Sequence, residues 1–247
     1  MRVLVTARQG SRRPFWIRFA GRSAPVVLLA GYAALQVLGR RAGTTHEERR
    51  ARLPCDHLVT RPQLVTDHAI TIDATPEDVW PWICQMGWHL GGYYTPEWVD
   101  RLLFRQNWQS LDHLDPALAR DLSEGDQVPD GPPGTASFVV AEVEARHVLV
   151  LRSSSHLPPA WRRSGARIDW TWSFRLTALP GGRTRLQLRM RGRTDPWWLT
   201  AVYLATIIPA DYVMARGMLS GLQRRAESSR TRRGPSAHPT RSSLQAQ

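Results

Sequence analysis

The sequence predicts an α+β domain in which an antiparallel sheet packs against a long helix near the C-terminus. Residues 68–73 alternate between the two faces of a half-buried strand and then run directly into a helix start. Residues 168–177 and 183–192 alternate in the same way on either side of the turn at 180–182, which predicts a hairpin with one apolar face. Residues 197–227 carry apolar side chains at helical spacing, so a helix there is expected to cover that face.

Two short helices are expected after the first strand. In residues 75–78 a threonine hydroxyl should bond the free amides, a proline fills the first turn, and two acidic side chains face the positive end of the helix. Pro81 should keep this helix short or kinked. The similar Thr-Pro-Glu start at 95–97 predicts a second helix over 95–103.

Two more strands are expected at 136–143 and 147–153, after turns rich in Gly and Pro. Within the C-terminal helix, Pro209 is expected to cause an interruption. Gly217 and Gly221 are expected to let this helix approach the sheet closely, because glycine has no side chain to hold the two apart.

Several segments occur in an order that is found in one known superfamily. They are Ala74–Trp82, Gln85–Gly87, Gly91–Tyr94, Gly125–Asp126, the strand Trp170–Leu176, Thr184–Leu186 and the helix end Arg224–Glu227. Over residues 60–228 the chain thus resembles the START-like superfamily, also called the SRPBCC or polyketide cyclase/dehydrase superfamily. The resemblance implies a helix-grip fold, in which a curved antiparallel sheet wraps around the C-terminal helix and leaves a ligand pocket between them. It implies no single activity, because the superfamily includes lipid carriers, hormone receptors and cyclases.

The pocket implied by the resemblance should be lined by aromatic and methionine side chains. The candidates are Trp88, Tyr93, Tyr94, Trp98, Phe138, Trp170, Trp172, Met190, Met214 and Met218. Rigid aromatics together with adaptable methionines are the mixture expected where an apolar ligand is held by few polar contacts. The alternative for each of them is that it simply fills the core.

Catalytic residues are harder to find. His89, with Tyr93 and Asp100 close in sequence, is a weak candidate for an acid/base cluster at the pocket mouth, and surface hydrogen bonding is the commoner role for such residues. His68 is more typical of a core histidine than of a ligand. The sequence has no HExxH, GxSxG or glycine-rich phosphate loop, and whether the protein is an enzyme stays open, with an absence of catalysis favoured.

No cofactor, metal or disulfide is expected, because Cys55 and Cys84 lie far apart and outside any ligand spacing. The net charge is +12, but every one of the 33 basic residues is Arg, as a GC-rich coding sequence would produce. Nucleic acid is therefore an unlikely partner.

One face of the predicted hairpin is basic. It carries Arg185, Arg189 and Arg191, with Arg175 beside them. We expect this face to be solvated, and docking on anionic lipid headgroups is the alternative.

The chain divides into four parts. Residues 1–41 are basic and contain an uncharged run over 23–39, which at about 1.5 Å per residue extends about 26 Å and is expected to form a single membrane anchor of undetermined orientation. A cytoplasmic protein is the alternative. Residues 42–64 are expected to form a polar linker, 65–228 the ligand-binding domain and 229–247 a disordered tail.

The expected function is the binding or carriage of a hydrophobic small molecule, such as a lipid, an isoprenoid or a polyketide-like compound, between the sheet and the C-terminal helix. A cyclase/dehydratase-type enzyme using the same pocket is one alternative. A basic adaptor for membrane surfaces or nucleic acid is another. These readings differ in what the pocket must contain, since a carrier needs an apolar cavity and a cyclase also needs polar groups that converge inside it.

Overall fold

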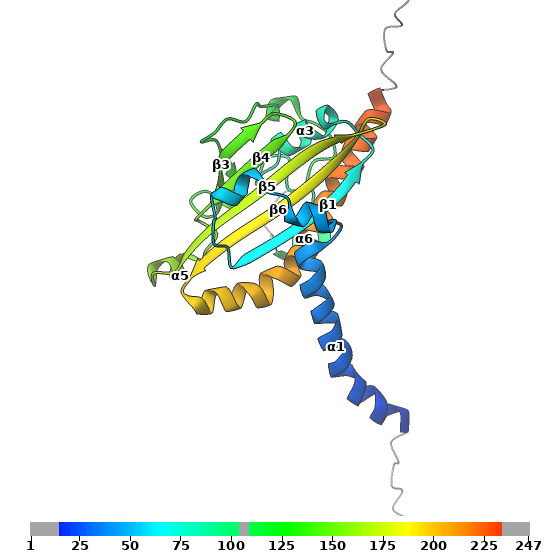
Figure 1. Ribbon diagram of the computed structural model, residues 1–247, viewed down its shortest axis with the longest axis vertical. Helices are drawn as coiled ribbons and strands as arrows, with labels where there is room; N and C mark the ends of the chain where they lie inside the picture. The colour runs from blue at the N-terminus through cyan, green and yellow to red at the C-terminus, as the bar shows by residue number, and fades with distance from the viewer. Residues whose placement is uncertain (1–14, 104–108, 234–247) are drawn as a thin grey trace, which may run out of the picture.

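A six-stranded antiparallel sheet curves around a long C-terminal helix in the computed structural model, which describes residues 15–103 and 109–233 (Figure 1). The strand order is β1-β6-β5-β4-β3-β2. The strands are β1 Leu64–Ile72, β2 Gln127–Pro129, β3 Ser137–Glu144, β4 Val148–Ser153, β5 Arg167–Leu179 and β6 Arg183–Asp195. The chain therefore has the α+β helix-grip fold that the sequence predicts.

The helices surround this sheet on both faces. They are α1 Phe15–Arg41, α2 His46–Arg50, α3 Pro76–Cys84, α4 Glu97–Leu103, α5 Pro159–Arg163 and α6 Trp197–Arg233, with short 3-10 turns at Pro54–His57 and Pro116–Leu118. The expected elements are thus present within a few residues of their predicted ends. Strand β2 was not expected, because its three residues lie between segments that read only as turns.

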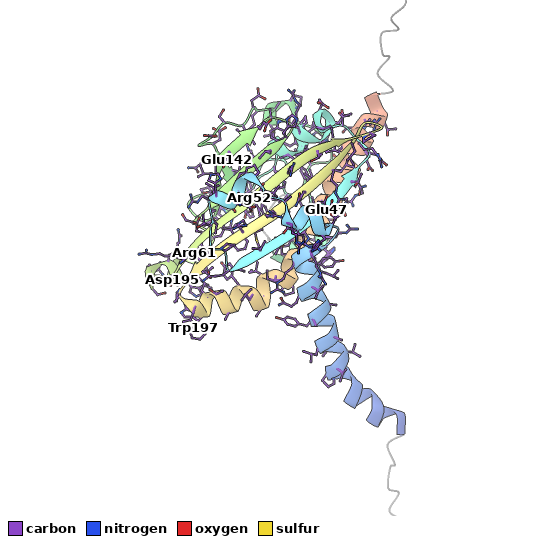
Figure 2. The ribbon with its side chains drawn as sticks, viewed as in Figure 1. Glu47, Arg52, Arg61, Glu142, Asp195 and Trp197 are labelled. Atoms are coloured by element: carbon purple, nitrogen blue, oxygen red, sulfur yellow. The ribbon has the colours of Figure 1, made fainter. Side chains whose placement is uncertain are left out.

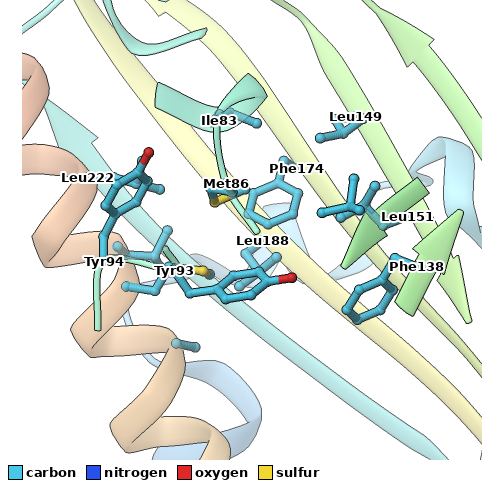
Figure 3. Packing of buried hydrophobic residues seen from close by; sticks show 14 of the residues in the cluster. Ile83, Met86, Tyr93, Tyr94, Phe138, Leu149, Leu151, Phe174, Leu188 and Leu222 are labelled. Carbon is cyan, nitrogen blue, oxygen red and sulfur yellow. The ribbon is translucent and has the colours of Figure 1, made fainter. Parts of the chain in front are cut away.

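The core lies between the concave face of the sheet and the second half of α6. The predicted alternation along β5 and β6 is confirmed, since Phe174, Leu186 and Leu188 are almost fully buried on this face. Met218 and Leu222 of α6 pack against them. Figure 3 shows that side chains from the sheet, from α3 and from the loop after it meet in one cluster.

Helix α6 bends where Pro209 lies inside it, and it continues as one helix of 37 residues (Figure 1). A proline has no N–H for the carbonyl four residues earlier, which here belongs to Ala205. The Tyr32 hydroxyl of α1 donates a hydrogen bond to that carbonyl oxygen at 2.8 Å. A side chain from another helix therefore replaces the bond that Pro209 removes.

Two local predictions need correction. The Thr75 hydroxyl donates to Asp78 Oδ2 at 3.1 Å and, in the described chain, does not bond the amides at the start of α3. Gly217 and Gly221 bring α6 against the loop at Tyr94 and Pro96, not against the sheet: a Cβ on Gly221 would lie 2.0 Å from the Tyr94 carbonyl oxygen. Sequence spacing identified the need for a close approach but not its partner.

Residues 42–63, which we call the strap, cross the convex face of the sheet in front of β6 and β1, on the side opposite α6 (Figures 1 and 2). Arg189 is 3% exposed and donates to Asp67 Oδ1 at 2.7 Å. Arg185 binds both carboxylate oxygens of Glu48, and Arg191 donates to Asp56 and to the Val59 carbonyl.

The prediction of a solvated basic face is therefore wrong for these three arginines. The strap is acidic where it meets the sheet, and its backbone carbonyls accept several of the arginine donors. Leu53 and Cys55 of the strap are buried against Val150, and burial raises the pKa of the Cys55 thiol to about 11. The segment expected to be a polar linker thus forms an outer layer on the sheet.

Helix α1 packs against the first half of α6 and against β1. Among the described residues, the helix that is long and apolar enough to cross a membrane is α6, not the predicted N-terminal anchor over 23–39. The second half of α6 belongs to the core, as Met218 and Leu222 show, so removing it from the sheet would expose that core. Residues 1–14 and most of the expected tail lie outside the described residues.

Candidate functional site

A cavity of about 470 Å³ lies between the concave face of the sheet and α6. Its floor is aromatic, with Phe138 from β3 and Trp170 and Trp172 from β5. Phe138 and Trp172 stack with ring centroids 5.3 Å apart. The opposite wall comes from α6, which contributes Tyr203, Ile207, Ala210, Asp211 and Met214.

The loop between β4 and α5 lines a third side. It contributes Ser155, His156 and the run Leu157–Pro159, and Arg162 of α5 follows. Most of the lining is apolar, and its volume falls in the range of about 300–1,000 Å³ typical of small-molecule sites. A smaller hollow of about 40 Å³ shares Asp130, Trp172 and Met214 with this cavity, so the two adjoin.

Polar groups converge at the junction of the two hollows. His156 Nε2 lies 2.7 Å from Asp130 Oδ2, and Nδ1 lies 2.7 Å from Ser153 Oγ. Because a carboxylate only accepts, the bond to Asp130 places a proton on Nε2. Ser155 bonds Ser153 in turn, and Tyr203 donates to the His156 carbonyl at 2.9 Å. The imidazole is thereby held in one orientation in a mostly apolar cavity.

Tyr93 extends this group into the smaller hollow. Its hydroxyl donates to the Pro129 carbonyl at 3.0 Å, and burial, together with the nearby Asp130 charge, holds its pKa well above the usual value. Asp100 lines the same hollow and accepts from the Thr95 hydroxyl. Burial raises the Asp100 pKa. Tyr93 is therefore a neutral hydrogen-bonding group at physiological pH.

A second buried histidine–carboxylate pair joins the sheet to α6. His68 Nε2 of β1 lies 2.9 Å from Asp211 Oδ2, and the two side chains are 1% and 8% exposed. Asp211 also lines the cavity. Within the described residues, His68 Nδ1 and the neighbouring Thr66 hydroxyl are buried without a hydrogen-bond partner. His68 is thus paired to a cavity residue and is more than the simple core residue that its apolar strand suggested.

Seven of the ten predicted ligand-binding residues line one or both hollows. Phe138 and Trp170 line the main cavity. Trp88, Tyr93 and Met218 line the smaller hollow. Trp172 and Met214 line both.

Three of the predicted residues lie elsewhere. Tyr94 is fully buried and donates to the Trp82 carbonyl at 2.7 Å, and Met190 is buried in the core. Trp98 is 59% exposed. The candidate catalytic His89 is exposed and stacks on Trp88 with centroids 5.4 Å apart, outside the residues that line either hollow.

Sequence reasoning missed Asp130, His156, Tyr203 and Asp211. Asp130 lies in a Pro- and Gly-rich segment, and His156 follows three serines, so both read as ordinary loop residues. Asp211 is the single charge in a long apolar stretch of α6, and that isolation was the available signal. Among the described residues there is no group of three potential metal ligands.

Fold and cavity together define a helix-grip domain with a small-molecule-sized pocket between sheet and helix. No protein-family model and no curated protein matches the chain.

Solved structures share the architecture at low identity. CalU16 from Micromonospora echinospora is 18% identical over 66% of this chain and 84% of that chain, with a TM-score of 0.32. DynU16, described as a protein in the dynemicin biosynthetic locus, is 17% identical over 67% of this chain and 48% of that chain, with a TM-score of 0.35. A hypothetical protein from Helicobacter pylori is 12% identical over 75% and 99% of the two chains, with a TM-score of 0.44. Such likeness concerns fold alone and assigns no activity.

Proposed function

We propose that this protein binds a hydrophobic small molecule in the cavity between the sheet and α6. The observation that carries the proposal is the cavity itself, about 470 Å³ in volume, mostly apolar, with a floor of three aromatic side chains. A concave, mostly apolar pocket of this size is the usual form of a small-molecule site. The ligand class is that of lipids, isoprenoids or polyketide-like compounds.

The ligand should also carry one polar group. Asp130, His156 and Arg162 lie in the cavity wall, where a few fixed polar groups can orient a mainly apolar molecule. Arg162 favours an anionic or carbonyl group at that end. The basic adaptor is the weaker alternative, since Arg185, Arg189 and Arg191 are occupied by the strap and are not free to meet a partner.

Blocking the cavity tests this proposal. The full chain, kept in solution with an amphipathic polymer, is titrated with cis-parinaric acid, and energy transfer from tryptophan is measured. Ala210→Trp places a large side chain in the cavity wall and should weaken binding at least about tenfold, the effect of losing roughly 1.4 kcal/mol. Val139→Trp adds the same side chain on the outer face of β3, where Val139 is 40% exposed, and should leave binding unchanged. Equal affinity in all three proteins would refute the proposal.

A cyclase/dehydratase-type reaction in the same cavity is a second candidate, favoured by the Asp130–His156–Ser153 chain. A histidine held between a carboxylate and a hydroxyl is suited to transfer protons, a contribution of about 100- to 10,000-fold when the group is positioned correctly. The lipophilic compounds that co-purify with wild type and with His156→Gln distinguish the two functions. A carrier retains the same compound in both, whereas a cyclase/dehydratase accumulates in the variant a precursor that differs by one water.

A further inference from the structure

The first half of α6 has two distinct sides. Residues 197–210 include no charged side chain. Tyr203, Ile207 and Ala210 line the cavity on one side. The other side, which we call the outer stripe, is exposed and consists of Trp197, Ala201, Val202, Ala205 and Thr206. A surface helix of a soluble protein normally places polar residues on its exposed side, so an apolar exposed side is unusual.

The two largest side chains of the outer stripe are exposed. Trp197 is 79% exposed and Val202 is 39% exposed. The Thr206 hydroxyl donates to the Val202 carbonyl at 2.8 Å and is therefore already bonded within the helix. The stripe thus presents an apolar surface to its surroundings beside the wall of the cavity.

Helix α1 continues this apolar surface. Val26, Val27, Leu28 and Leu29 are 66–73% exposed. Four successive residues, at about 100° each, occupy most of a helix circumference, so among the described residues no protein packs around this part of α1. A partner that contacts one side would leave the other sides bare, whereas lipid acyl chains surround a helix completely.

The two helices are fixed to each other at this end of the molecule. Gln36 of α1 donates to the Leu204 carbonyl at 2.8 Å, beside the Tyr32 bond to Ala205. Gly39 lies against the backbone of Ile208, where a Cβ would be 2.0 Å from the carbonyl oxygen. Figure 1 shows α1 leaving the body next to the first half of α6 and pointing away from the sheet.

Positive charge lies near Trp197, at one end of the outer stripe. The exposed arginines at this end of the sheet are Arg61, Arg162, Arg163, Arg167 and Arg193. Figure 2 shows Arg61 and Asp195 near Trp197. Asp169, which is opposite Arg193 in the sheet, is paired with Arg152. An apolar surface beside a mainly basic one matches the interface of an anionic phospholipid bilayer.

We propose that this end of the molecule docks on an anionic bilayer, with the outer stripe and the apolar surface of α1 in contact with lipid. Pro158, Pro159 and Arg162, which are exposed residues of the cavity lining, then lie at the membrane surface. Together with the proposed function, on which this step rests, docking implies that the ligand is a lipophilic molecule of the bilayer. Such a molecule can enter the cavity without passing through water. Arg162 lies both in the cavity wall and in the basic surface, where it can meet a polar group of the entering molecule.

Docking is tested by site-specific quenching. Cys55 and Cys84 are buried, so Val202→Cys and Val139→Cys can each be labelled with one environment-sensitive dye in the full chain. With vesicles of phosphatidylcholine and phosphatidylglycerol that contain spin-labelled lipid, the dye at 202 should be quenched and the dye at 139 should not. High salt should reduce this quenching by screening the arginines. No quenching at 202 would overturn docking, and a dimer that protects 202 would assign the stripe to a second copy instead.

Ligand entry is tested separately with Trp197→Asp/Val202→Asp. Uptake of cis-parinaric acid from the same vesicles should slow at least about tenfold, because the charges weaken contact of the stripe with lipid. The equilibrium affinity in amphipathic polymer should stay at the wild-type value, since neither side chain lines the cavity. An unchanged uptake rate would refute entry from the bilayer. If the wild-type protein binds no probe but the dye at 202 is still quenched, the proposed ligand function is refuted and membrane docking is supported.

Discussion

Replacing Arg189 by methionine should release the strap from the sheet. The Arg189 side chain is 3% exposed, and each of its three nitrogens is bonded: Nε to Asp67, Nη1 to Ala51 and Asp56, and Nη2 to Glu48 and Arg49. Three of these acceptors are backbone carbonyls in or just after α2. The last carbonyls of a helix have no partner within the helix, so they are free to accept from Arg189. One side chain therefore holds both the end of α2 and the buried carboxylate of Asp67.

The magnitude follows from that burial. Five charge-assisted bonds at about 1.5–3 kcal/mol each would add up to the whole stability of a typical domain, so the bonds cannot be treated as additive. The closer guide is the removal of one partner from a buried ion pair, which costs about 3–5 kcal/mol because the other charge stays behind. Here that charge is Asp67, 5% exposed. For a domain of this size the melting temperature should fall by about 2–4 °C per kcal/mol.

Thermal and urea unfolding measure the loss, and hydrogen exchange locates it. Arg189→Met should speed exchange in α2 and in the 3-10 turn Pro54–His57. Arg189→Met/Asp67→Asn should regain part of the loss, because the double variant leaves no isolated buried charge. Arg175→Met, on the same sheet face outside the ion-pair cluster, is the matched control. A destabilisation below about 0.5 kcal/mol, typical of surface changes, or unchanged exchange in the strap would refute this account of Arg189.

The bond from Arg185 lowers the pKa of Glu48 below 4.5 in the folded protein, so this contribution to stability is complete above pH 4.5 and is lost as the pH falls through the folded-state pKa. Urea unfolding should therefore show a smaller acid-induced loss for Glu48→Gln than for wild type, and equal losses would contradict the assignment. Gly221→Ala should destabilise by about 1–3 kcal/mol, because its Cβ would clash with the Tyr94 backbone, whereas Gly31→Ala, in open space, should be neutral or stabilising by up to about 1 kcal/mol. Equal melting temperatures for the two glycine variants would show that the close approach at Tyr94 is not rigid.

Periodicity predicted the sheet and the main helix well, because alternation and helical spacing report burial directly. The hairpin of β5 and β6 is the clearest case, since Phe174 and Leu188 face the core as expected. Arg189 shows the limit of the method. Alternation placed it correctly on the face opposite Leu188, but the nature of that surface depended on a segment more than 130 residues away. From strand periodicity alone, a charged sheet face is predicted to be exposed to solvent, even where another segment covers it.

The site was predicted only in part, because some of its residues are brought together by segments that are distant in sequence. Large apolar residues such as Trp172 and Met214 could be assigned to the interior from their strand and helix positions. His156 and Asp130 lie in loops 26 residues apart, and only the folded chain brings them to 2.7 Å. Trp98 shows the opposite case, an aromatic residue whose size suggested the pocket but whose position on α4 exposes it.

The bond between Tyr32 and Ala205 affects how the protein can be shortened for study. A fragment that starts at the first strand would lack the hydroxyl that completes α6 at Pro209, as well as the strap that binds the sheet arginines. The segment of α6 that loses its support is the one that carries Tyr203 and Ile207 of the cavity wall. Such a fragment could retain its sheet and its overall helical content and still present a collapsed or widened pocket, so a negative binding result obtained with it would reflect the truncation and not the protein.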